Sequence, residues 1–458
     1  MSAIDFSEFG ASNKETWQMQ LEKELYGKQL VDQSWEIADS VYIQPYYTSD
    51  EIQPGLTGDL LSAQRKTSGW LNTAFIRFEN QAVTNSKIRS ALTSGADGII
   101  LDLGTYTLPQ CELTKTLHAI RLSDYFIYFS STQNPELLYL EIARGAGYYL
   151  KGGIANDPVA QWMRGGHEVG KSLDEVGNVL RKTKPMKDFR PLSVESHIYH
   201  NAGANPIQEL AFMISALVTC TDHLTDLGIS PLHVLNRFFF SVSIGTEYLT
   251  EIAKLRALRL LYRKITRAYK LPDELCHAFI HTQSSSFYHA NSVPHTNMIR
   301  VTSEAMSAVN GGCDALTVHS YNQSGDEFSN RIANNVSLLI SNETNLRQVA
   351  DPAAGSYLLD RMSLSMADAA WEIFLGIEEQ GDILQYFRNG FVKSEIESSW
   401  KQKIDGMQNK KVMVGVNKYN DPEKNKPGNK QAFKERIEGD QRVLPNRNLA
   451  DEWLLNNS

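Results

Sequence analysis

One segment near the middle of the chain constrains the fold more than any other. Residues 237–244 are rich in Phe, Val and Ile, which predicts a strand buried on both faces, as in a parallel sheet. After Gly245, Leu and Ile recur at helical spacing as far as Leu261, which predicts an amphipathic helix. Its basic residues are expected to turn outward: Lys254, Arg256, Arg259 and Arg263. A strand that leads directly into such a helix indicates an α/β fold.

Short apolar runs alternate with helical patterns elsewhere in the chain. The predicted strands are 98–103, 125–129, 147–150, 192–197, 237–244, 277–281, 314–318 and 337–340. Helical patterns fall between most of them, for example at 206–226 and 297–309. This alternation predicts a (β/α)8 TIM barrel. An open doubly wound sheet is the alternative, and it is weakened because no strand is followed by a G-x-G-x-x-G turn or a P-loop.

The two ends of the chain differ from this pattern. N-cap residues from Ser12 precede a predicted helix with Trp17, Leu21 and Leu25 on one face, and an irregular run follows to about Gln64. Because an isolated helix of this length is marginal in water, its apolar stripe should pack on the main domain or on a partner. The chain from Trp400 is polar and is expected to wrap the surface. The predicted division is an arm (1–64), a barrel (65–399) and a tail (400–458).

Composition excludes several classes of protein. The 458 residues carry a net charge of -8, with no dense basic stripe beyond the predicted helix, so nucleic acid is not expected as a partner. The cysteines are scattered, without a C-x-x-C pair, which predicts neither a zinc site nor disulfides: Cys111, Cys220, Cys276 and Cys313. Neither a signal peptide nor an apolar run of membrane-spanning length is recognised. We therefore expect a cytoplasmic protein with no membrane partner.

Polar side chains fall at the ends of the predicted strands, where barrels of this type carry their active sites. They are Asn156, Asp157, His197, Tyr199, His200, His281, Gln283 and His319. No pair of histidines has H-E-x-x-H spacing and no nearby Cys or carboxylate completes a ligand set, so no metal site is predicted. His197 and His200 are candidates for an acid/base pair because imidazole titrates near neutrality. A solvated or capping role is the alternative for each.

Several strings of residues together resemble one family. They are Glu-Ile-Ala-Lys-Leu-Arg-Ala at 251–257, Gln-Pro-Tyr-Tyr-Thr at 44–48, Asn-Ala-Gly-Ala-Asn-Pro-Ile-Gln-Glu-Leu-Ala at 201–211, Arg-Val-Thr-Ser-Glu-Ala-Met-Ser-Ala-Val at 300–309, Asp-Pro-Ala-Ala-Gly-Ser-Tyr at 351–357 and Val-Gly-Val-Asn-Lys-Tyr at 414–419. Over residues 13–419 the chain resembles the cobalamin-dependent acyl-CoA mutases, the methylmalonyl-CoA mutase family. The resemblance implies a TIM barrel that binds the coenzyme A ester along its axis. A separate C-terminal domain of such proteins brings adenosylcobalamin to the barrel mouth for a radical carbon-skeleton rearrangement.

The chain departs from the family at positions that carry this chemistry. The cobalamin domain is recognised by Asp-x-His-x-x-Gly, but no histidine follows His319, so this chain alone is not expected to bind the cofactor. The Thr and Gln that contact the acyl-CoA fall on Gly153 and Ala155. The Arg that contacts substrate and cobalamin falls on Gly165, beside Arg164.

Two further departures concern the barrel interior. The family's His that bonds the thioester carbonyl falls on Ile198 or, after a shift of one residue, on His197. A small Ser that faces the coenzyme A channel falls on Phe239, whose ring would help to fill the barrel. The resemblance therefore implies no complete catalytic set in this chain.

Other positions of the family's site are retained. Arg237, His281 and Gln283 match substrate-contacting positions. Glu304 and Ala305 match residues that touch the corrin in active chains. For each of the five, packing or support of a loop is the alternative interpretation.

The resemblance predicts a small, non-catalytic subunit of heterodimeric adenosylcobalamin-dependent methylmalonyl-CoA mutase, in which a large catalytic subunit is the partner. No cofactor is expected on this chain alone, and adenosylcobalamin is expected in the holoenzyme. One alternative is the substrate-binding chain of a split mutase of the isobutyryl-CoA type, with cobalamin on a separate chain. Another is a barrel that serves as a scaffold or binds an acyl ligand outside the mutase system. Whether acyl-CoA still enters the barrel stays open.

Overall fold

The structure is a computed structural model. It describes residues 13–26, 33–38, 41–51, 54–146, 149–165, 168–322, 325–409, 411–419 and 443–456.

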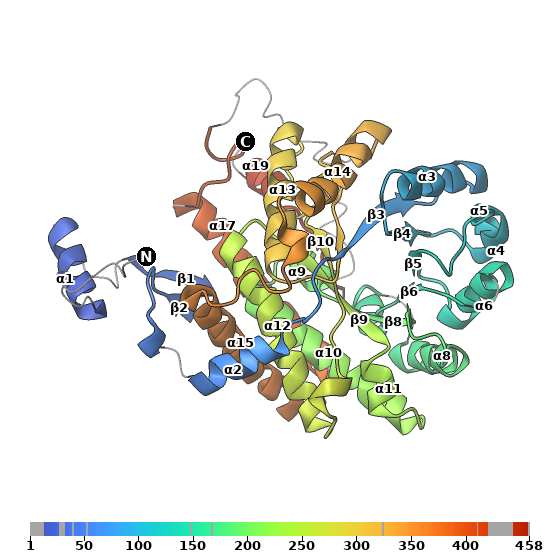
Figure 1. The fold of residues 1–458 in the computed structure, drawn as a ribbon, viewed down its shortest axis with the longest axis horizontal. Helices are drawn as coiled ribbons and strands as arrows, with labels where there is room; N and C mark the ends of the chain where they lie inside the picture. The colour runs from blue at the N-terminus through green and yellow to red at the C-terminus, as the bar shows by residue number, and fades with distance from the viewer. Residues whose placement is uncertain are drawn as a thin grey trace, which may run out of the picture.

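A closed barrel of parallel strands forms the centre of the molecule (Figure 1). The strands are β3 (Leu71–Arg77), β4 (Gly98–Asp102), β5 (Phe126–Ser130), β6 (Gly152–Ala155), β7 (Phe189–Arg190), β8 (Leu192–Glu195), β9 (Phe238–Ile244), β10 (Ile280–Ser284) and β11 (Ala315–Thr317). β7 pairs with β6 and β8 pairs with β9, while β11 pairs with β3 and closes the ring. Only Pro191, which has no N–H to donate, separates β7 from β8. The two segments therefore fill one of eight positions, which confirms the predicted TIM barrel.

Helices surround the barrel. They are α3 (Gln81–Thr93), α4 (Leu108–Cys111), α5 (Leu113–Thr116), α6 (Pro135–Ala146), α7 (Pro158–Met163), α8 (Val169–Lys182), α9 (His197–Ala202), α10 (Pro206–Asp226), α11 (Pro231–Leu235), α12 (Tyr248–Ala268), α13 (Pro294–Asn310), α14 (Glu327–Glu343), α15 (Tyr357–Glu379), α16 (Ile383–Arg388), α17 (Phe391–Asn409) and α19 (Leu449–Asn456). α15 packs across α10 and α12 as a further layer on one side of the barrel (Figure 1). The predicted helix at 206–226 is confirmed at its residue bounds.

The N-terminal part contains the predicted helix, α1 (Lys14–Glu24), which begins at a capping box on Asn13. None of its residues is buried, and the Trp17 ring contacts Tyr46 at 4.6 Å between ring centroids. The irregular run that was predicted after α1 instead includes a hairpin, β1 (Trp35–Ala38) with β2 (Val41–Ile43), and α2 (Pro54–Ala63). Figure 1 shows α1 projecting from the body, whereas α2 lies against α12 and α15. The apolar stripe of α1 is thus only partly covered within the chain.

Three predicted strands were misplaced, and two strands of the barrel, β3 and the short β7, were not predicted. The run at 337–340 lies inside α14, because a short apolar run cannot be told from a buried helix by periodicity alone. The strand expected at 147–150 begins at Gly152, whose φ of +97° favours glycine, and the one expected at 277–281 is β10. β3 was missed because Asn72 and Thr73 interrupt its apolar pattern.

Three of the four basic residues of α12 that were expected to face solvent are buried, and Arg263 is 14% exposed, so that expectation was wrong. Lys254 and Arg256 have 0% exposed side chains, and Arg259 has 4%. Each of these cations has carboxylate partners: Lys254 pairs with Glu209 of α10 and with Glu251 of α12 itself, Arg256 with Asp351 and Asp360, and Arg259 with Asp314. Helical periodicity could not reveal this, because it describes α12 alone and not the helices that cover its second face.

The end of the described chain returns to the barrel. α17 runs through position 400, and α19 follows residues 443–448. The division into 1–64, 65–399 and 400–458 stays a prediction. The four cysteines are free thiols. Within the described ranges, no helix is long and apolar enough to cross a bilayer.

Candidate functional site

The lower half of the barrel interior is filled by aromatic side chains. Strand register places one row of residues across β3 to β7: Phe75, Ile100, Tyr128, Gly153 and Arg190. This row reaches the mouth at Phe75, whose ring centroid lies 4.9 Å from that of His319. Tyr128 is 0% exposed and Phe239 of β9 is 1% exposed, with ring centroids 5.0 Å apart. The Arg190 guanidinium carbon lies 4.2 Å from the centroid of the Phe279 ring. These side chains occupy the axis of the barrel between its two ends.

The upper half, at the C-terminal ends of the strands, is polar instead. His197 begins α9, and its Nδ1 and Nε2 lie 2.7 Å and 2.8 Å from the hydroxyls of Ser243 and Ser241. The Ser241 hydroxyl is 2.8 Å from His281 Nδ1, and His281 Nε2 is 2.8 Å from the Thr317 hydroxyl. The hydroxyls of Thr317 and Thr73 are 2.6 Å apart. A continuous chain of hydrogen bonds therefore runs from His197 at the mouth to Thr73 in the interior of the barrel.

Gln283 fixes the proton positions in this chain of bonds. Its Nε2 donates to His197 Nδ1 at 3.0 Å, and its Oε1 accepts from His319 Nε2 at 3.2 Å. His197 must then carry its proton on Nε2 and donate to Ser241, whose own proton goes to His281 Nδ1. All three imidazoles satisfy these bonds in the neutral form.

Burial favours the same neutral state. Burial, and then the neighbouring His281, holds the pKa of His197 well below its usual value. Burial also lowers the pKa of His281 to about 3 and the pKa of His319 to about 4. Near neutral pH the mouth is therefore polar and carries no imidazolium charge.

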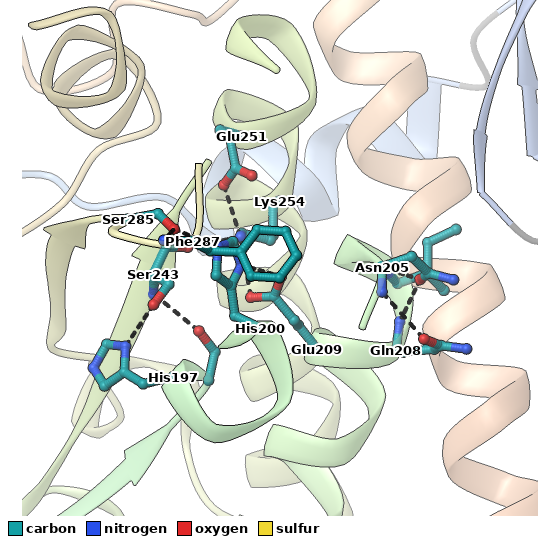
Figure 2. A network of polar contacts seen from close by, with 12 residues as sticks. His197, His200, Asn205, Gln208, Glu209, Ser243, Glu251, Lys254, Ser285 and Phe287 are labelled. Carbon is teal, nitrogen blue, oxygen red and sulfur yellow. Dashed lines mark hydrogen bonds and ion pairs between the residues drawn. The ribbon is translucent and has the colours of Figure 1, made fainter. Parts of the chain in front are cut away.

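A second network lies behind the mouth and contains His200 (Figure 2). Its Nδ1 is 2.8 Å from Glu209 Oε1, and its Nε2 is 2.7 Å from the Ser285 hydroxyl. Lys254 Nζ is 3.2 Å from Glu209 Oε2 and donates to the Ser243 carbonyl at 2.8 Å. Although burial raises the pKa of the Glu209 carboxyl, Lys254 and His200 hold it at about 2. The predicted pair His197 and His200 thus lies in two neighbouring networks, and each ring bonds to its own set of partners.

The remaining predicted substrate positions lie in different parts of the barrel. Ile198 is 2% exposed and packs in the core outside the strands, whereas His197 faces the barrel interior. Arg237 precedes β9, at the end opposite the mouth, and donates to the carbonyls of Phe189 at 2.6 Å and Thr183 at 3.0 Å. Burial lowers the pKa of Arg237 to about 10. Its guanidinium is thus bonded to backbone of the chain itself.

Glu304 and Ala305 lie on α13 and are each 1% exposed. Glu304 Oε2 accepts from the Ser285 N–H at 3.0 Å, and in the described part of the chain Oε1 has no partner. Burial raises the pKa of Glu304 well above its usual value. Ala305 belongs to the main hydrophobic core. Neither side chain is therefore accessible to a ligand at the surface of the barrel.

The residues that follow β6 support the start of α7. Asp157 Oδ1 accepts from the Ala160 N–H at 2.9 Å, and Oδ2 accepts from the Glu195 N–H at 2.8 Å. Burial, and then Glu195, raises the pKa of Asp157 to about 7. Asn156 is 1% exposed, and neither of its side-chain polar atoms has a partner in the described residues.

The other residues singled out near this end have structural surroundings. Tyr199 packs in the core with its ring 5.2 Å from that of Phe212, and Ala155 packs against the aromatic cluster. Arg164 ends α7, and Gly165 follows it with a φ of +81°.

Sequence reasoning missed the hydroxyls that join the histidines and the aromatic side chains below them. A signal was present in β9, where Phe239, Ser241 and Ser243 share one face because side chains alternate along a strand. Tyr128 and Arg190 carried no such signal. Among the described residues, no group of three or more His, Cys, Asp or Glu could hold a metal ion.

Comparison with known proteins gives a consistent family. A family model described as methylmalonyl-CoA mutase matches residues 137–446. The chain is 26% identical over 439 residues to the methylmalonyl-CoA mutase small subunit of Porphyromonas gingivalis, covering 90% of this chain and 71% of that protein. The small subunit of Streptomyces virginiae is 27% identical over 405 residues, covering 84% and 65%. A methylmalonyl-CoA mutase of Rhizobium meliloti is 27% identical over 435 residues, covering 84% and 61%. The chain thus spans between 61% and 71% of the length of these three relatives.

Proposed function

Because the chain belongs to the methylmalonyl-CoA mutase family, we propose that it is the small, non-catalytic subunit of a heterodimeric adenosylcobalamin-dependent mutase. The proposed holoenzyme interconverts methylmalonyl-CoA and succinyl-CoA in the cytoplasm, and a large subunit carries the catalytic site. Relatives named as small subunits support this role. The partly covered stripe of α1, with Trp17, is a surface on which such a partner could pack.

The observation that carries the proposal is the filled axis of the barrel. The family resemblance implies that a coenzyme A ester lies along this axis. Here Tyr128 and Phe239 meet in the interior at 5.0 Å, and Arg190 stacks on Phe279. Because protein interiors are close-packed, a pantetheine chain could pass only if these side chains moved aside. We therefore propose that this barrel does not take acyl-CoA along its axis.

The mouth supports the same conclusion. Activation of a thioester carbonyl requires a donor that is free to reach its oxygen. His197 Nε2, the candidate donor, is already engaged with Ser241, and His281 Nε2 is engaged with Thr317. His197, His281 and His319 thus each engage their N–H within the described part of the mouth.

The two residues that match corrin-contacting positions, Glu304 and Ala305, are also not placed to contact the cofactor. A residue that touches a corrin must present its side chain at a surface, but Glu304 and Ala305 are both buried. We therefore assign adenosylcobalamin of the holoenzyme to the large subunit and derive no step of the radical reaction through this chain.

Purified chain alone should show no turnover of methylmalonyl-CoA with adenosylcobalamin and no corrinoid absorbance. Co-expressed with a large mutase subunit, it should co-purify in one complex. Turnover by this chain alone would overturn the proposal. If turnover appears only after a stand-alone cobalamin-binding chain is added, the split-mutase alternative is correct. A monomer that binds neither a large mutase subunit nor a stand-alone cobalamin-binding chain would favour the scaffold alternative.

A further inference from the structure

The last described segment, residues 443–456, crosses the rim of the barrel at the C-terminal ends of the strands. Three backbone hydrogen bonds mark its path: Leu444 N to Met163 O at 3.3 Å, Arg447 N to Asn201 O at 2.7 Å and Leu449 N to Phe287 O at 3.0 Å. The three acceptors belong to the units that follow β6, β8 and β10. One short segment therefore ties together three separate parts of the rim.

Side chains of three residues reinforce this path: Arg447, Asn448 and Asp451, whose carboxylate accepts from Asn291 Nδ2 at 3.0 Å. Arg447 donates to Glu397 Oε1 at 2.6 Å and lies over the Trp400 ring, 4.9 Å from its centroid. Asn448 Nδ2 donates to the carbonyls of Ser286 at 3.0 Å and His289 at 2.9 Å. The loop that follows β10 is thus held from above by α19 and the residues just before it.

Beneath this segment lies a small apolar cluster that is separate from the main core. It comprises Phe287, Ala290, Trp400, Met407, Val416, Leu449 and Ala450. The Phe287 ring also contacts the His200 imidazole, with ring centroids 5.5 Å apart. Detachment of α19 would therefore expose an apolar surface beside the His200 network, whereas Leu444, earlier in the same segment, packs in the main core.

The segment carries a carboxyl group in an unusual position. Glu452 of α19 is 8% exposed, and its Oε1 has no hydrogen-bond partner within the described ranges. The charged groups that face it are Arg447 and Asp451 of the same segment and Glu397 of α17. One cation, already paired with Glu397, faces three carboxyls, so an ionised Glu452 is poorly compensated.

We propose that residues 443–456 form a releasable strap that holds the rim of the barrel closed while Glu452 is protonated. Loss of the proton leaves a buried carboxylate next to two others, and detachment of the strap returns that charge to water. The released state exposes the apolar cluster and the loop at 286–291. This inference does not depend on the proposed mutase role.

The direction of the pH dependence follows from the closed state. Burial raises the pKa of Glu452 to about 7 from its ordinary value of 4.5, and Arg447 only partly opposes this. The contribution of the proton to closure is fully present below 4.5 and is lost as the pH rises through about 7. We therefore expect the strap to be held more firmly at pH 5.5 than at pH 8.

Hydrogen exchange of the full chain, read by mass spectrometry and corrected for intrinsic rates, tests the strap. Peptides from α19 and from 286–291 should lose protection together, by about tenfold or more, between pH 5.5 and pH 8. Peptides from α6, remote from the strap, should not change. Release of all peptides together, or of none, would overturn the proposal.

Two variants distinguish the contribution of the Glu452 proton from that of the other contacts that hold the strap. Glu452→Gln keeps a neutral side chain, so the pH dependence of exchange in α19 should disappear, whereas Glu372→Gln at an exposed position of α15 should leave it intact. Arg447→Ala should raise exchange in α19 and 286–291 at both pH values because it removes the anchor to Glu397. If Glu452→Gln retains the wild-type pH dependence, the assignment to Glu452 is wrong.

Discussion

The two halves of the barrel interior are built on the same strands but contain opposite chemistry. In β9, Phe239 faces the aromatic lower half, while Ser241 two residues later faces the polar mouth. The lower half is held by dispersion and ring contacts, which depend on shape. The upper half is held by hydrogen bonds that fix the proton positions of His197, His281 and His319. Packing in the lower half therefore controls whether a ligand can pass along the barrel axis. The protonation of the imidazoles in the upper half controls the charge of the barrel mouth.

Removal of a ring from the lower half should have the largest effect. Phe239→Ala leaves a cavity between Tyr128 and Phe279, and we expect a loss of about 3–5 kcal/mol in the free energy of unfolding. The exposed Phe328 of α14 provides the control, because Phe328→Ala should change stability by less than about 0.5 kcal/mol. Urea unfolding measures both. Equal losses would mean that the axis is not packed as described.

A fall in pH should weaken the contribution of the upper half to stability, because the lower half contains no histidine among the side chains described above. A histidine with a lowered pKa contributes stability that is fully present above its ordinary value of 6.5 and is lost as the pH falls toward its folded value, about 3 for His281. Each such histidine should remove about 1.4 kcal/mol per pH unit between pH 6 and pH 4. Urea midpoints measured across this range should fall, and His281→Gln should reduce the slope. An unchanged slope in that variant would contradict a neutral His281.

The polar upper half of the barrel could be predicted from the sequence better than the aromatic lower half. The strand at β9 and the rule that polar residues gather at strand ends were enough to predict the barrel and to nominate His197, His281 and Gln283. Phe239 was nominated because it departs from a family pattern. Tyr128 and Arg190 were not, since a strand buried on both faces does not reveal which face lies inside the barrel.

The wrong expectation that the basic residues of α12 face solvent has a related cause. Lys254 and Arg256 look like a solvated face in sequence, but Glu209 and Asp360, which compensate them, lie on other helices. Pairing between distant elements is a property of tertiary packing. The same limit applies to Glu452, whose environment includes Glu397 of α17.

A single hydroxyl at the junction of the two halves should have the smallest effect. Thr317 is 0% exposed, and its hydroxyl bonds to Thr73 and to His281 Nε2. Thr317→Val keeps the volume but leaves the His281 N–H without an acceptor, so we expect a loss of about 1–3 kcal/mol. Thr105→Val at an exposed loop position is the control. If Thr317→Val and Thr105→Val lose equal stability, the Thr317 hydroxyl does not act as the acceptor for His281.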